Sequence, residues 1–150
     1  SRLCVRPSGT VRITAISPVL REVAMTGTGT VTSDGVLRSE SLAARITGAG
    51  DMDLAVETPT LATTITGTGT VRLRGTAGDH TISLPGAGAV DAAGLMTERT
   101  TVEILGSGDA KVNASQTLTV KITGTGTVLY SGNPRIDQTI TGTGSVRPLP

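Results

Sequence analysis

Apolar and polar residues alternate in short runs along most of this chain, and a Gly-x-Gly motif separates one run from the next. Before one such motif the apolar residues Leu118, Val120 and Ile122 are spaced by two, and the spacing resumes after it at Val128 and Tyr130. A period of two over short runs is typical of β-strands with one buried face. Thr and Gly interrupt every window that could form a useful helix, so the pattern predicts an all-β protein.

The Gly-x-Gly motif occurs seven times, most clearly in the segment Ile-Thr-Gly-Thr-Gly-Thr-Val at residues 122–128. Its glycines are Gly27 and Gly29, Gly48 and Gly50, Gly67 and Gly69, Gly86 and Gly88, Gly106 and Gly108, Gly124 and Gly126, and Gly142 and Gly144. The first glycines of successive copies are 21, 19, 19, 20, 18 and 18 residues apart. A period near twenty indicates a solenoid with one coil per repeat. We expect the glycines to form structural corners, where a tight bend is needed.

Stacking such coils places equivalent strands side by side and in parallel. Strand–crossover–strand connections of this kind are strongly biased to the right hand. The sequence therefore predicts one domain over residues 1–150, a right-handed parallel β-helix of seven to eight coils of 18–21 residues. Residues 1–24 contain a degenerate first coil, residues 25–147 the regular coils, and residues 148–150 a short tail.

Each position of the coil becomes a column of side chains once the coils are stacked. Seven residues after the apolar residue that opens the motif, the column contains a charge ladder that alternates in sign: Asp53, Arg72, Asp91 and Lys111. Opposite charges on neighbouring strands contribute roughly 0.2–1 kcal/mol per pair. A slip by one coil would bring like charges together, so we interpret the ladder as a structural device that specifies register.

A second column contains hydroxyl side chains at the middle position of the motif: Thr28, Thr68, Thr125 and Thr143. Because Thr26, Thr28 and Thr30 are spaced by two, they are expected to share one face of a strand and to form a flat binding wall for glycan or ice. Ala49, Ala87 and other residues interrupt that array. The simpler interpretation is that Thr is present for its β-propensity.

The sequence offers little for catalysis or for a cofactor. His80 is the only histidine, in a column with Leu42, Leu61, Leu118 and Ile136, which favours a corner or partly buried side chain over a catalytic base. Asp51 and Asp53 could form a carboxylate pair, yet no aromatic platform for a sugar accompanies them. A dinucleotide site needs a third glycine opening a helix, and a calcium β-roll needs aspartates every nine residues. We therefore predict no enzyme activity, no cofactor and no metal.

Composition narrows the partners further. The formal charge of +1 gives no electrostatic reason to expect nucleic acid. No apolar run approaches the ~18 residues that span a bilayer, so membrane insertion is not predicted. Cys4 is the only cysteine, which excludes an intramolecular disulfide and leaves a buried thiol or an intermolecular bridge open. The sequence begins without Met, which suggests removal of a signal peptide and an extracellular or cell-surface location.

Three motifs carry a resemblance to a known family: residues 102–112, Tyr130-Ser131-Gly132-Asn133-Pro134, and Gly142-Thr143-Gly144-Ser145-Val146. In their order the chain resembles the bacterial head GIN domain, a family of autotransporter-adhesin head domains, over roughly residues 25–147. The resemblance implies a right-handed β-helix, export, and a role at the cell surface or in adhesion. It supplies no catalytic residues. This chain departs from the family by favouring Thr-Gly-Thr-Gly over Ser-Gly-Ser-Gly.

Solenoids need polar terminal units to cover their open ends. No such caps are evident here, so we expect the two ends to be adhesive, with Val5, Val11 and Ile13 at one end and Ile140 and Val146 at the other. A contact between different ends does not close and generates a filament. The leading hypothesis is a structural or adhesion protein that joins end to end with itself, or with other surface adhesins, into a fibre. The alternative is a monomeric binding module that recognises glycan or ice.

Overall fold

The structure is a computed structural model that describes residues 2–5, 10–14, 22–38 and 40–148. It is all-β. Its strands are β1 (Arg2–Val5), β2 (Thr10–Thr14), β3 (Glu22–Gly27), β4 (Thr30–Arg38), β5 (Leu42–Gly48), β6 (Asp51–Gly67), β7 (Thr70–Leu84), β8 (Ala89–Gly106), β9 (Asp109–Gly124), β10 (Thr127–Ser131), β11 (Arg135–Gly142) and β12 (Ser145–Pro148). The four longest, β6 to β9, each run from one Gly-x-Gly motif to the next.

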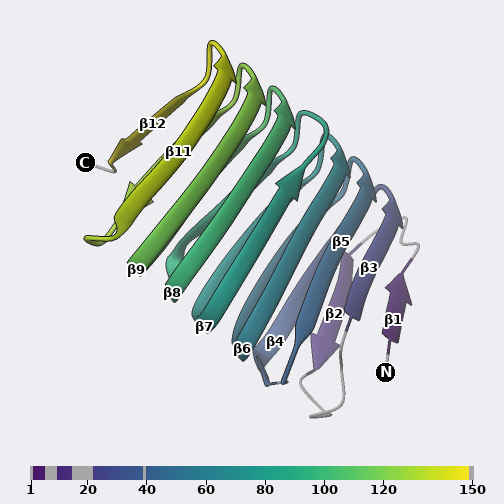
Figure 1. The fold of residues 1–150 in the computed structure, drawn as a ribbon. Coiled ribbons are helices and arrows are strands. Elements are labelled where there is room, and N and C mark those ends of the chain that lie inside the picture. Colours follow the sequence, from purple (N-terminus) through teal and green to yellow (C-terminus); the bar gives the residue numbers. More distant parts are fainter. Residues whose placement is uncertain (1, 6–9, 15–21, 39, 149–150) are drawn as a thin grey trace.

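The chain winds as a β-solenoid in which every strand pairing is parallel (Figure 1). In Figure 1 the chain rises along the near strands, crosses behind at the upper corners, descends, and begins the next coil beside the last, which is a right-handed winding. The predicted right-handed parallel β-helix is confirmed. It has about six turns rather than seven to eight, because the terminal copies of the repeat lie in short strands of four to five residues such as β1, β2 and β12.

We call the strand surface that precedes each Gly-x-Gly motif face 1, and the surface that follows it face 2. Face 1 contains β3, β5, β11 and the C-terminal parts of β6 to β9, whereas face 2 contains β4, β10, β12 and the N-terminal parts of β6 to β9. In β6 the alternation of buried residues slips by one at Pro59 and Thr60, which are both exposed. The coil bends there and returns from face 2 to face 1.

The core is made of apolar columns between the two faces. On face 2 one column is in register through the stack, in the order Val31, Met52, Val71, Val90, Ala110, Val128 and Val146. All but Val146 are at most 2% exposed. Fully burying a side chain of this size stabilises the fold by roughly 1.5–3 kcal/mol, so the repeated columns are the main source of stability.

The Gly-x-Gly corners also stack on one another. Thr68 N donates to Gly48 O at 3.0 Å, and Ala87 N donates to Gly67 O at 3.0 Å, so the backbone ladder continues around the bend. Gly67 adopts φ +125°, a conformation that L side chains rarely adopt. A Cβ on the second glycine, Gly69, would lie 2.8 Å from Ile46 Cγ2. The first glycine therefore allows the turn, and the second allows adjacent coils to approach closely.

Candidate binding surface

The four residues of the charge ladder lie side by side on face 2. Asp53 pairs in register with Arg72, Arg72 with Asp91, and Asp91 with Lys111. Adjacent strands in a sheet are about 4.8 Å apart, so each charge lies next to one of opposite sign. The column spacing inferred from the repeat thus corresponds to a real line of side chains across β6 to β9.

The ion pairs among the described residues do not join neighbouring members of the charge ladder. Arg74 Nη2 lies 3.2 Å from Asp53 Oδ1, although Asp53 has Arg72 as its register neighbour. The other two pairs join in-register residues one coil apart: Arg38 Nε to Glu57 Oε2 at 2.9 Å, and Arg99 Nε to Asp79 Oδ1 at 2.8 Å. All are substantially exposed, so each contributes at most about 1 kcal/mol. The sequence contains a signal for the latter two pairs, because their opposite charges are one repeat apart.

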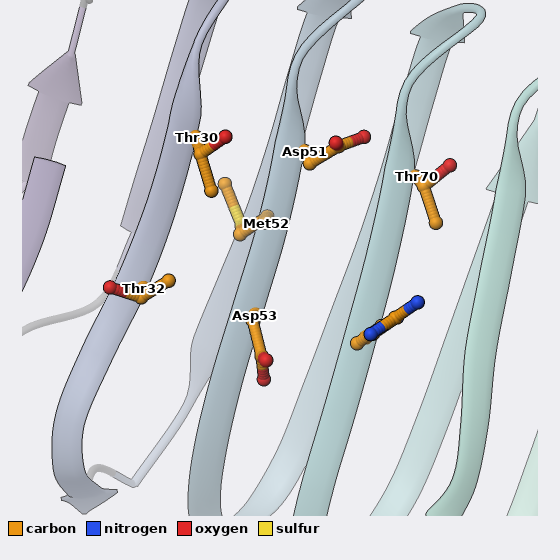
Figure 2. Close-up of a pocket in the computed structure, with 7 residues that line it drawn as sticks. Thr30, Thr32, Asp51, Met52, Asp53 and Thr70 are labelled. Atoms are coloured by element: carbon orange, nitrogen blue, oxygen red, sulfur yellow. The ribbon is translucent and has the colours of Figure 1, made fainter. Parts of the chain in front are cut away.

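A groove of about 290 Å³ lies on face 2 beside the ladder. Figure 2 shows side chains from three successive coils around it. Those with polar groups are Thr30, Thr32, Asp51, Asp53, Thr70 and Arg72, and the buried Met52 also lines it. A second groove of about 280 Å³ shares Asp53 and Arg72 with the first and extends to Arg74 and Asp91. The two grooves form a continuous polar band along the axis of the stack.

The two candidate carboxylates both point outward in this groove. Asp51 is exposed and Asp53 is half-buried, with the inward-pointing Met52 between them. Arg74 holds Asp53, so Asp51 is the freer hydrogen-bond acceptor of the two. The groove combines carboxylates, guanidinium groups and hydroxyls, a set suited to binding a polar ligand. The absence of enzyme activity stays a prediction.

The threonines of the proposed wall lie at the tips of the corners. Thr28, Thr68, Thr125 and Thr143 are exposed, but strand β3 ends at Gly27 and strand β4 begins at Thr30. The chain turns between them, so Thr26 belongs to face 1 and Thr30 to face 2. The expectation that Thr26, Thr28 and Thr30 share one flat face was wrong, because the positive φ of Gly27, 103°, redirects the strand. The four threonines lie at corner tips, and Ala49, Ala87 and Ser107 occupy the same position in the coils between them.

His80 is buried, at 1% exposure, in the column predicted for it. Its register neighbours are Leu61 and Thr100, and Nε2 lies 3.0 Å from Thr63 Oγ1. In the described part of the chain its Nδ1 is a buried nitrogen without a hydrogen-bond partner. Desolvation by burial lowers the pKa of His80 to about 3, so the ring is neutral. It is more deeply buried than the corner or partly buried position expected from the sequence.

Across residues 2–5, 10–14, 22–38 and 40–148, no group of three or more His, Cys, Asp or Glu side chains is placed to hold a metal ion. In the same ranges, no helix is long and apolar enough to cross a membrane.

The predicted end-to-end residues lie in the terminal coils. Val5 is in β1, where it pairs with Met25, and Val11 and Ile13 are in β2 opposite Val31 and Ser33. Cys4 pairs with Ala24. At the other end, Ile140 and Val146 are half-buried and pack against the core beside Tyr130, while Ile136 is 37% exposed. The apolar side chains of the C-terminal coil are therefore less buried than those of the central coils.

The comparison with protein families bears directly on this fold. The family described as "Putative auto-transporter adhesin, head GIN domain" matches residues 4–134. The chain belongs to the head GIN domain family. The resemblance inferred from the three motifs is thereby confirmed, and an adhesin-like family membership is established for the solenoid. No functionally curated protein matches the chain.

Solved structures share the fold of this head GIN domain. One, described as a putative lipid binding protein from Parabacteroides distasonis, has TM-score 0.89 and 24% identity, covering 99% of this chain and 61% of its own. One described as a putative adhesin from Bacteroides fragilis has TM-score 0.83 and 27% identity, covering 89% and 62%. A putative adhesin from P. distasonis has TM-score 0.84 and 21% identity, covering 99% and 60%. The chain therefore spans about three fifths of these structures.

Proposed function

We propose that this head GIN domain is an exported adhesion module of the cell surface, in which the solenoid serves as a stiff structural element. Its membership of an adhesin-like family supports this, as does the 27% identity to the B. fragilis protein described as a putative adhesin. Backbone pairing between successive coils makes a rod that holds its lateral faces at a fixed spacing. A rod of this kind is suited to presenting a binding surface away from the cell.

In this proposal the module joins end to end with another solenoid, whose strands continue the parallel pairing. The observation that carries it is the C-terminal coil, where β11 pairs with β9 and β12 pairs with β10. Among the described residues no further strand pairs with the other side of β11 and β12, where Ile136 is 37% exposed and Ile140 and Val146 are half-buried. Unpaired strand edges recruit further strands. The proposed partner is a second copy, whose first coil has the same parallel register.

Replacing Ile136 by lysine tests this proposal. A charge at Ile136, near the start of β11, would have to be desolvated in an end-to-end contact, so the I136K variant is expected to associate at least about tenfold more weakly. Multi-angle light scattering after size exclusion, with electron microscopy over a wide range of concentration, measures the effect. The experiment uses the 150-residue chain, because any following polypeptide would compete for the same edge.

The control is M96K, because Met96 is 63% exposed on the side of the solenoid, away from the last coil. It adds the same charge in place of an apolar residue and is expected to leave association unchanged. Circular dichroism melting should show that both variants remain folded. A wild-type chain that stays monodisperse and monomeric at every concentration would contradict end-to-end association and favour a monomeric binding module.

A further inference from the structure

Two charged side chains in the groove on face 2, Arg72 and Asp51, form no ion pair with the other described residues. Arg72 lies in register between Asp53 and Asp91. However, Asp53 Oδ1 is held by Arg74 at 3.2 Å, and Asp91 Oδ1 accepts a bond from Ala93 N at 3.4 Å. Among the described residues, neither Arg72 nor Asp51 takes part in an ion pair. Both side chains are exposed and line the groove.

These two groups are separated by a distance that suits a small polar ring. Asp51 pairs in register with Thr70, and Arg72 is two residues farther along the same strand. Strands about 4.8 Å apart with a rise of about 3.3 Å per residue put the Cα atoms of such diagonal neighbours about 8 Å apart. The space beside them is the groove of about 290 Å³, where the Thr30, Thr32 and Thr70 hydroxyls complete the polar lining. One end of the groove thus offers a guanidinium and the other a carboxylate.

The chemistry of these groups selects the ligand. A guanidinium binds a carboxylate through two parallel hydrogen bonds, and a carboxylate accepts bonds from neighbouring hydroxyl groups. None of the described residues that line the groove is aromatic, so a neutral sugar would lack a stacking surface. Asp51 and Asp53 repel any anion, and a doubly charged phosphate more strongly than a singly charged carboxylate. A ring that carries one carboxylate and several hydroxyls satisfies both groups.

We propose that face 2 binds an acidic polysaccharide, with the carboxylate of a hexuronic acid on Arg72 and its ring hydroxyls on Asp51 and Thr70. The inference deepens the proposed adhesion function and rests on it. The second groove, of about 280 Å³, shares Arg72 and lies one coil farther along. A polysaccharide chain that runs parallel to the solenoid axis would place its next sugar there, and two linked contacts raise the overall affinity.

Titration of the ¹⁵N-labelled 150-residue chain with an oligogalacturonate, followed by NMR, tests the inference. Shifts are expected to cluster at Asp51, Thr70 and Arg72. Losing a bidentate contact to a charged group should weaken binding at least about tenfold, so R72Q should show that loss. R45Q is the matched control, because Arg45 is exposed on β5 of face 1 and its replacement changes the net charge equally.

Two further ligands test whether binding depends on the carboxylate of the sugar. A neutral oligogalactose should bind more weakly than the oligogalacturonate, and a sulfated oligosaccharide should not bind more tightly. Absence of oligogalacturonate binding, equal losses in R72Q and R45Q, or preference for the sulfated or neutral sugar would each overturn the inference. Light scattering reports end-to-end association separately, so a chain that assembles yet binds no oligogalacturonate would refute this site alone.

Discussion

Replacing Gly67 by alanine is expected to destabilise the domain by roughly 2–5 kcal/mol. Two costs combine at this position. The backbone has φ +125°, which strains any residue with a Cβ, and the added methyl group would overlap Gly48 O in the coil below. That oxygen accepts the hydrogen bond from Thr68 N at 3.0 Å, so relieving the overlap would break the corner ladder. Urea unfolding monitored by circular dichroism measures the loss.

T68A provides the control, because Thr68 is the exposed middle residue of the same corner. Its side chain points away from the stack, and its replacement should change stability by no more than about 0.5 kcal/mol. Amide exchange adds a local test, since G67A should speed exchange at the amide of Thr68 and of its neighbours in the ladder. If G67A and T68A unfolded at the same denaturant concentration, the structural role assigned to the first glycine would be wrong.

The period of the sequence was sufficient to predict how the coils stack. Residues one repeat apart, such as Asp53 and Arg72, pair in register because each coil is one turn of the backbone and every corner has the same two glycines. Insertions between coils move into bulges, as between Arg72 and Arg74, without changing the columns on either side. Register therefore depends on backbone geometry that the repeat encodes directly.

Two features depended on geometry that the repeat does not encode. A period of two predicts one straight strand through Thr26, Thr28 and Thr30, whereas the positive φ of Gly27 turns the chain between faces. The partner of Asp53 depends on side-chain reach, which lets Arg74 contact it from two residues beyond its register neighbour. The groove follows from both effects, because Asp51 and Arg72 become available only once the turn and the ion pairs are in place.

The full burial of His80 could not be predicted from the apolar and polar pattern either. Its column contains Leu42, Leu61 and Leu118, which indicates an inward position, but His is compatible with an exposed corner as well. The outcome depended on Thr63, whose hydroxyl lies inside the core and bonds the ring. Burying Thr63 and His80 together costs less free energy than burying either one alone, because the two side chains form a hydrogen bond with each other.

That burial makes the domain sensitive to acid. The pKa of His80 is lowered to about 3 in the folded state, against 6.5 for an exposed histidine, so the unfolded chain binds the proton first as the pH falls. The stability contributed by keeping the ring neutral is complete above pH 6.5 and is lost at about 1.4 kcal/mol per pH unit between 6.5 and 3. From pH 7 to pH 4.5 the expected loss is roughly 2–3 kcal/mol.

The double variant H80L/T63V isolates this effect, because leucine matches the rest of the column and valine removes the hydroxyl that would lose its partner. Urea unfolding from pH 7 to pH 4.5 should show that the wild type loses more stability than the double variant as the pH falls. Asp and Glu residues contribute to both proteins, so their titration cancels in that difference. Parallel pH profiles would contradict a buried neutral His80, whereas a flatter profile for the variant supports it.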